Sequence, residues 1–131
     1  MSEILLTTLN AKYIHASLGL RYLMANLGEL SMRAKIREFT IHDSPQDIAE
    51  ILVAEEPAII GFGVYIWNTL ETLELVQIIK RTHPEIVLVL GGPEVSYEYQ
   101  DQELYKVCDY VVVGQGDISF SELCTQILEG V

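Results

Sequence analysis

The stretch AIIGFGV, residues 58–64, is apolar throughout and holds no charged side chain. Pro57 precedes it, and the segment YIWNT, residues 65–69, follows it. A short apolar run of this kind is typical of a central parallel strand, because helices cover both faces of a parallel sheet. We therefore predict that residues 58–64 form a central strand of a parallel sheet.

Other short apolar runs alternate along the chain with stretches of helical period. The further predicted strands are residues 4–9, 36–41, 86–90 and 110–113. This alternation predicts an α/β fold in which helices cover both faces of one sheet. Arg37 and Glu38 would not be tolerated in a strand covered on both faces, so residues 36–41 are predicted at one edge of the sheet and residues 110–113 at the opposite edge.

Helical periodicity predicts which side chains turn toward the sheet. Ser44 and Pro45 are predicted to begin a helix, since serine is a common N-cap and proline a common first helical residue. Its predicted inward side chains are Ile48, Ile51 and Leu52. In the helix that ends before His83 and Pro84, the predicted inward side chains are Leu70, Leu73, Val76 and Ile79.

Composition bounds the class of protein. The 131 residues suit one compact domain with a hydrophobic core. With 8 Lys+Arg against 19 Asp+Glu, the net charge is -11, which leaves little basic surface for phosphates, so we expect no nucleic acid and no membrane as partner. No apolar run approaches the roughly 20 residues of a membrane span, and the chain opens on Met1-Ser2-Glu3 and not on the basic flank of a signal peptide. We expect a soluble, cytoplasmic protein.

The two cysteines, Cys108 and Cys124, are too few for a disulfide framework and too far apart for a metal or redox pair. They are expected to be buried thiols. No other residues stand at the spacing of a metal site, so no metal site is predicted.

Ligands of open parallel sheets bind beyond the carboxyl ends of the strands, near the point where the strand order reverses. Four loops at that edge hold unusual residues: NAKYIH (10–15), YIWNT (65–69), GGPE (91–94) and GQGD (114–117). Glycine and aromatic residues there suit the close approach of a large flat ligand to the backbone. Each feature also has a structural explanation, since Gly-Gly turns a chain, glycine in a strand lets a helix pack closely, and a loop histidine commonly bonds to backbone.

Rival functions of such a fold lack their motifs here. Neither the phosphate-binding Gly-x-x-x-x-Gly-Lys-Ser/Thr nor the dinucleotide Gly-x-Gly-x-x-Gly after the first strand is present. A phosphoacceptor domain needs an aspartate at the end of the third strand and a lysine at the end of the fifth, where this chain has Val64-Tyr65 and Val113-Gly114. No nucleophile, base and orienting group stand at recognisable positions, so no catalytic residue is predicted.

Taken together, the loops resemble the cobalamin-binding domain at the amino end of many radical S-adenosylmethionine (SAM) enzymes. The resemblance covers nearly the whole chain and rests on the order and spacing of LNAKYIH (9–15), IIGFGVY (59–65), VLGGPE (89–94) and VVVGQGD (111–117). It implies a flavodoxin-like fold, a doubly wound five-stranded parallel sheet of order 2-1-3-4-5. It also implies that the corrin ring lies across the carboxyl edge and that the nucleotide tail enters a groove lined by glycines.

The resemblance implies a set of cofactor-binding residues. Glycines line the tail groove and border the base of the tail: Gly91, Gly92, Gly114 and Gly116. Beside the ring would lie Tyr65, Trp67, Asn68 and Thr69. The other candidates in these loops are Asn10, His15, Pro93, Glu94 and Gln115.

Two departures from the family pattern bear on the chemistry. Domains that coordinate cobalt through histidine carry Asp-x-His-x-x-Gly after the first strand, whereas Tyr13 and Leu18 stand at the flanking positions around His15. His15 is therefore not expected to bind cobalt. The Cys-x-x-x-Cys-x-x-Cys motif of a radical SAM iron–sulfur cluster is also absent. SAM and the cluster are expected only in a missing downstream domain.

The resemblance thus implies that residues 1–131 are one cobalamin-binding domain, a fragment of a longer radical SAM protein. Its expected function is to bind and orient cobalamin for the radical SAM barrel of the same polypeptide, which would act on a small-molecule substrate by methyl transfer or by radical rearrangement or cyclisation. The chain is not expected to be catalytic alone. The alternative is a degenerate flavodoxin-like interaction or substrate-gating domain that no longer binds cobalamin.

Overall fold

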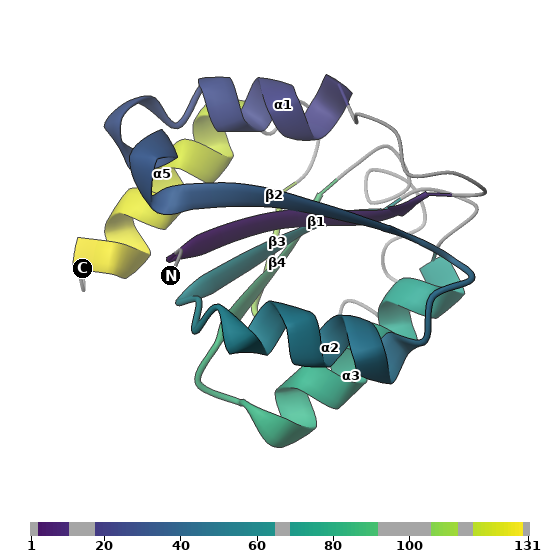
Figure 1. Ribbon diagram of the computed structural model, residues 1–131. Coiled ribbons are helices and arrows are strands. Elements are labelled where there is room, and N and C mark those ends of the chain that lie inside the picture. Colours follow the sequence, from purple (N-terminus) through teal and green to yellow (C-terminus); the bar gives the residue numbers. More distant parts are fainter. Residues whose placement is uncertain (1–2, 11–17, 65–68, 92–105, 113–116, 130–131) are drawn as a thin grey trace.

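The secondary structure follows the alternation in the sequence (Figure 1). The structure, a computed structural model, describes residues 3–10, 18–64, 69–91, 106–112 and 117–129. In chain order the elements are β1 (Ile4–Asn10), α1 (Leu18–Ala25), the 3-10 helix η1 (Gly28–Arg33), β2 (Ala34–Thr40), α2 (Pro45–Ala54), β3 (Ile59–Gly63), α3 (Thr69–Thr82), β4 (Val87–Gly91), β5 (Tyr110–Val111) and α5 (Asp117–Glu129).

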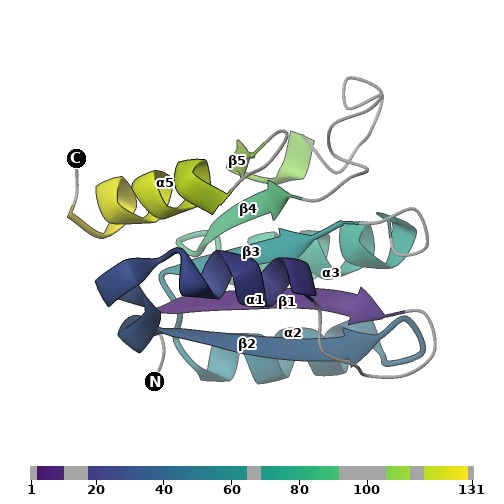
Figure 2. The same cartoon turned by 90° about the horizontal axis from the view of Figure 1, so that it is seen from above.

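Within the described ranges, five strands form one sheet in the order β2-β1-β3-β4-β5, and every neighbouring pair is parallel. This confirms the predicted flavodoxin-like α/β fold and its strand order. Helices α1 and α5 cover one face of the sheet, and α2 and α3 cover the other (Figure 1, Figure 2). Because all strands run the same way, their carboxyl ends meet at one edge, where ligands of such sheets bind.

Each face of the sheet has its own core. The cluster under α2 and α3 includes Leu5, Leu9, Leu52, Ile60 and Ile79. The cluster under α1 and α5 includes Ile4, Leu6, Ile59, Phe120 and Cys124. Successive residues of a strand face opposite sides, so the even-numbered residues of β1 face α1 and α5 while the odd-numbered ones face α2 and α3.

The charged strand β2 lies at an edge of the sheet, as predicted. Its neighbour β1 is buried at all seven positions. On the α2 side of β2, the carboxylate of Glu55 lies 3.1 Å from Arg37 Nε and 3.3 Å from Lys35 Nζ. The two cations of β2 are therefore paired with the carboxylate that directly follows α2.

Two of the predicted inward side chains are exposed. Ile51 of α2 is 43% exposed and Leu70 of α3 is 64% exposed, so both predictions were wrong. Each residue advances a helix by about 100°, and repeated three-residue steps drift around its axis. Leu70 consequently stands on the side of α3 opposite to the residues that are buried, which are Thr72, Leu75, Val76 and Ile79. In α2 the buried residues are Ile48, Ala49 and Leu52.

The outer strand β5 is shorter than predicted. In the part of the chain that the structure describes, only Tyr110 and Val111 pair with β4. Backbone bonds just outside the strand extend the contact: Asp109 N–H donates to Leu88 O at 3.0 Å, and Val112 N–H donates to Leu90 O at 2.8 Å. Among the helices of the described ranges, each falls short of the length and apolarity that a membrane crossing needs.

Candidate cofactor site

Three positions with small or no side chains lie in one row across the sheet. Thr8 of β1 pairs with Gly63 of β3, and Gly63 pairs with Gly91 of β4. Gly63 and Gly91 end their strands, so the row lies near the carboxyl edge. Their side-chain positions face α1 and α5, because Leu6 and Ile59, an even number of residues earlier in β1 and β3, belong to the core on that face. We call Thr8, Gly63 and Gly91 the glycine row.

The glycine row is tied together at its β1 end. The hydroxyl of Thr8 donates a hydrogen bond to the carbonyl oxygen of Gly63 over 2.8 Å. Thr8 is 2% exposed, so this bond is shielded from competition by water. This hydrogen bond thus holds the carboxyl ends of β1 and β3 together at Gly63, the last residue of β3.

The free space next to the backbone differs between Gly91, in the glycine row, and Gly61, which lies two residues before Gly63 in β3. Among the described residues, a Cβ added to Gly91 would meet only the carbonyl oxygen of Val112, at 3.9 Å. A Cβ added to Gly61 would stand 3.1 Å from both Leu6 Cδ2 and Phe120 Cζ. The packed core therefore reaches Gly61, where Phe120 of α5 lies against the backbone, and the backbone at Gly91 has room for a ligand to approach closely.

A buried carboxylate continues the row on the β2 side. Glu38 pairs with Thr8, and its side chain is 6% exposed. Its two oxygens accept hydrogen bonds from Asn10 Nδ2 at 3.4 Å and from Arg21 at 3.3 Å. The amide of Asn10, a candidate residue, is therefore turned toward β2 and lies on the other side of β1 from Gly63 and Gly91.

The structure describes three of the candidate residues. Asn10 and Gly91 end β1 and β4 at the same edge, separated by β3, and Thr69 begins α3. The other candidates lie outside the described residues: His15, Tyr65, Trp67, Asn68, Gly92, Pro93, Glu94, Gly114, Gln115 and Gly116. Their roles stay predictions.

Thr8 and Gly63, which the sequence did not single out, belong to the glycine row of the candidate site. The sequence interpretation of glycines in the third strand was close helix packing, and the structure gives that role to Gly61. The neighbouring Gly63 instead joins Thr8 and Gly91 through the pairing of β1, β3 and β4. The sequence signal that could have revealed the row was a glycine at the end of each of two adjacent parallel strands.

Neither cysteine has the character of a ligand or nucleophile. Burial, together with the charge of Asp109, raises the pKa of Cys108 to about 12. Burial raises the pKa of Cys124 to about 12. Both are free thiols and stay protonated at neutral pH, where a metal or a reaction would need the thiolate.

Comparison with known proteins identifies relatives of this chain. A family model described as the B12 binding domain matches residues 4–124. The cobalamin-dependent radical SAM methyltransferase TokK of Streptomyces tokunonensis is 28% identical over 79 residues, which are 60% of this chain and 11% of that protein. The chain therefore spans a small part of the length of this curated relative.

Solved structures share the fold at low sequence identity. The cobalamin-dependent S-adenosylmethionine radical enzyme OxsB, with aqua-cobalamin bound, matches with a TM-score of 0.76 at 14% identity, over 98% of this chain and 19% of that one. A cobalamin-binding protein from Desulfitobacterium hafniense matches with a TM-score of 0.67 at 15% identity, over 95% of this chain and 58% of that one. These structural matches establish the fold alone. The family model, in contrast, matches most of the sequence, residues 4–124. The chain therefore belongs to the B12 binding domain family.

Proposed function

We propose that this chain binds cobalamin at the carboxyl edge of its sheet and presents it to a radical SAM catalytic domain of the same polypeptide. The observation that carries the proposal is the open backbone at Gly91, in the glycine row of a B12 binding domain. The relative TokK is a cobalamin-dependent radical SAM methyltransferase, which supports a catalytic domain of that kind as the partner.

The proposed contacts follow from the shape of the ligand and the surface of the sheet. Cobalamin has a flat corrin ring and a nucleotide tail, and the tail would lie along the two glycines of the row, Gly63 and Gly91, where no side chain separates it from the backbone. Gly92 would continue this path beyond Gly91, with Gly114 and Gly116 at the base of the tail. The proposed neighbours of the ring are Tyr65, Trp67, Asn68 and Thr69, which offer aromatic faces and hydrogen-bonding groups.

The packed residues of the site would shape the bound ligand. Phe120 fills the space beside Gly61, so it would close the apolar end of the path and keep water from entering there. The bond from Thr8 to Gly63 would keep β1 and β3 from separating when the ligand binds. In this proposal the chain binds, orients and shields, and it performs no bond-breaking step.

When bound, cobalamin would supply the reactive metal centre, for methyl transfer or for a radical rearrangement or cyclisation of a small-molecule substrate. Cys108 and Cys124 do not provide thiolates for an iron–sulfur cluster, so SAM and its cluster would be held by the catalytic domain. We place this function in the cytoplasm.

A spectroscopic titration tests the proposal. Hydroxocobalamin is titrated into the purified chain, and equilibrium dialysis measures the amount bound. We expect saturable binding and the absorbance spectrum of cobalamin whose own base has left the cobalt. No binding at high cofactor concentration would reject the proposal and favour an interaction or gating domain of the same fold.

The role of His15 has its own readout in the same titration. His15→Ala should leave the spectrum of the bound cofactor unchanged, because the sequence around His15 lacks the Asp-x-His-x-x-Gly pattern of cobalt-binding histidines. A clear spectral shift would assign His15 to the cobalt.

A further inference from the structure

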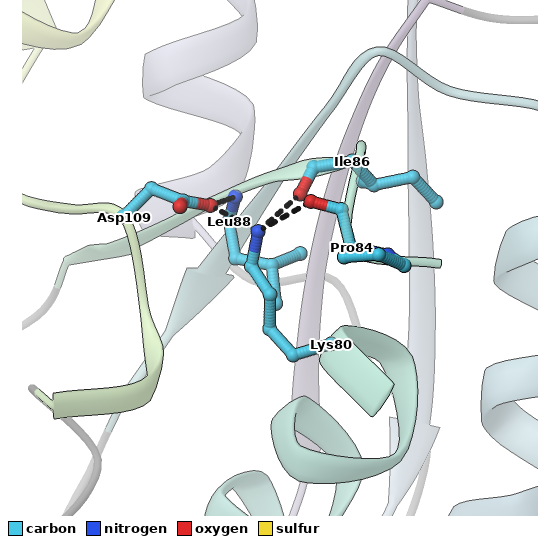
Figure 3. Close-up of polar contacts among 5 residues, drawn as sticks. All are labelled: Lys80, Pro84, Ile86, Leu88 and Asp109. Carbon is cyan, nitrogen blue, oxygen red and sulfur yellow. Dashed lines mark hydrogen bonds and ion pairs between the residues drawn. The ribbon is translucent and has the colours of Figure 1, made fainter. Parts of the chain in front are cut away.

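Lys80 joins the end of α3 to the connection before β4 and to the start of β5 (Figure 3). Its Nζ donates hydrogen bonds to the carbonyl oxygens of Ile86 at 2.8 Å and Pro84 at 3.1 Å. The same nitrogen lies 2.7 Å from Asp109 Oδ2. An ammonium group has three donors, so each donor of Lys80 has an oxygen to meet.

Asp109 lies immediately before β5 and bonds twice to Leu88 of β4. Its N–H donates to Leu88 O at 3.0 Å, and its Oδ2 accepts from Leu88 N–H at 2.8 Å. The N–H of the preceding residue, Val87, donates to Ala58 before β3, so the N–H of Leu88 points to the opposite side, where β5 has not yet begun. The carboxylate of Asp109 therefore takes the place of a strand carbonyl at the edge of β4.

These contacts matter because β5 is short. Its described ladder holds two residues, so the position of the strand along β4 depends on the bonds that flank it. A slip of one residue would move β5 by about 3.3 Å and turn its side chains to the other face. The charge pair of Lys80 and Asp109 is also better shielded than the pair of Arg33 and Glu3, with side chains 19% and 35% exposed against 44% and 47%.

The far end of β5 reaches the glycine row. Val112 follows β5 directly, and its carbonyl oxygen is the described atom nearest to the open space at Gly91. A displaced β5 would carry this oxygen into the path of a ligand or away from it. The contacts of Asp109 and Lys80 lie near the start of β4. Through β5 they thus influence where the Val112 carbonyl lies beside Gly91, at the end of β4.

We propose that Lys80 and Asp109 are positioning residues for the cofactor site, because they fix the start of β5 and, through β5, the Val112 carbonyl beside Gly91. They touch no ligand themselves. This inference rests on the proposed function, since it assigns these contacts a role in cobalamin binding.

The test compares cobalamin with cobinamide, which has the corrin ring but lacks the nucleotide tail. Lys80→Met removes the charge and keeps most of the length of the side chain. Arg33→Met is the matched control, because Arg33 pairs with Glu3, far from β5 along the sheet. Dissociation constants are measured by absorbance titration at a temperature where circular dichroism shows every variant folded.

We expect Lys80→Met to weaken cobalamin binding about tenfold and cobinamide binding much less, because the tail is the part that would lie beside Gly91. Arg33→Met should change neither. Lys80→Arg keeps the positive charge next to Asp109 and should restore most of the affinity for cobalamin. These differences between ligands are not expected from a purely structural role.

Two results would overturn the inference: unchanged cobalamin affinity in folded Lys80→Met, or equal losses for the two corrinoids. Should Lys80→Met fail to fold, Asp109→Asn decides the matter by the same criteria, because an asparagine oxygen still accepts the Leu88 N–H while the charge pair is lost. A wild-type chain that binds neither corrinoid would reject the proposed function itself, so the two failures are distinguishable.

Discussion

The ring of Phe120 lies directly against the backbone of Gly61, with Cζ 3.1 Å from the position that a Cβ would take. Leu6 Cδ2 stands at the same distance from that position. Both side chains are enclosed, at 3% and 1% exposed, and both belong to the core under α1 and α5. Even a methyl group at Gly61 would therefore have to displace packed side chains.

Gly61→Ala is expected to lower the free energy of unfolding by about 1–2 kcal/mol, the usual cost of overpacking a core. Gly91→Ala is the control, because its Cβ would meet only the Val112 oxygen among the described residues, at an ordinary contact distance of 3.9 Å. It should change stability by less than about 0.5 kcal/mol. Urea unfolding followed by circular dichroism measures both. Equal stability of the two variants would contradict the packing described for Phe120.

Gly91→Val should separate ligand binding from folding. The backbone there is extended, so valine fits the strand, but its methyl groups would project into the space proposed for the cofactor. We expect cobalamin affinity to fall at least about tenfold while the free energy of unfolding changes by less than about 1 kcal/mol. Equilibrium dialysis and urea unfolding give the two quantities. Wild-type affinity in a folded Gly91→Val chain would remove Gly91 from the site.

Two adjacent threonines of β1 are expected to respond in opposite ways to the same substitution. Thr7 faces the α2 and α3 side, is fully buried, and its hydroxyl has no hydrogen-bond partner among the described residues. Thr7→Val should therefore stabilise the fold by about 1 kcal/mol, because it removes an unsatisfied buried group. Thr8→Val loses the bond to Gly63 and should destabilise the fold by about 1 kcal/mol. Thermal unfolding of both variants that gave the same sign would contradict this assignment.

The Glu55 contacts with β2 predict a pH dependence of stability. Burial raises the pKa of the Glu55 carboxyl, but hydrogen bonds from Arg37 and Lys35 outweigh burial and hold the pKa below its usual value of 4.5. A carboxyl whose pKa is lowered by folding stabilises the fold above its unfolded pKa, and this contribution is lost as the pH falls through the folded pKa.

Wild type should therefore exceed Glu55→Gln in stability by about 0.5–1 kcal/mol at pH 7, and the difference should vanish well below pH 4.5. Urea unfolding over that pH range measures it. As a control, Arg37→Gln in the Glu55→Gln background should cost little more. A stability difference that is independent of pH would show that the negative charge of Glu55 contributes nothing to the free energy of unfolding.

Charge and apolarity are properties of single segments, so they were sufficient to predict which strands lie at an edge or at the centre of the sheet, whereas the full strand order came from the family resemblance. Arg37 and Glu38 marked an edge strand, and the uncharged run 58–64 marked a central one. The faces of the helices were harder to predict. Leu70 fitted a three-residue repeat of apolar residues, but the face of α3 that packs against the sheet does not include Leu70 and does include Thr72.

The edge of the sheet that carries the candidate site was predictable from the sequence, but the strand pairing that assembles the glycine row was not. Gly91 lies at the expected edge, since the end of a parallel strand can be recognised locally. The pairing that joins Thr8, Gly63 and Gly91 depends on the register between strands far apart in sequence. The orientation of Asn10 likewise depends on Glu38, which β2 brings beside it. The short β5 depends on Asp109 and Lys80, which no local pattern connects.

The interior position of β1 in the sheet has a consequence for the synthesis of the chain. β1 leaves the ribosome before the other strands of this sheet, yet its pairing partner in β3 lies 55 residues later, as from Thr8 to Gly63. At about 5–20 residues per second, the partner follows roughly 3–11 s after β1. During that time, one side of an apolar strand has no native neighbour. A translation pause placed between β1 and β3 should therefore reduce the yield of this domain more than a pause placed after β3. Removing chaperones should increase this effect.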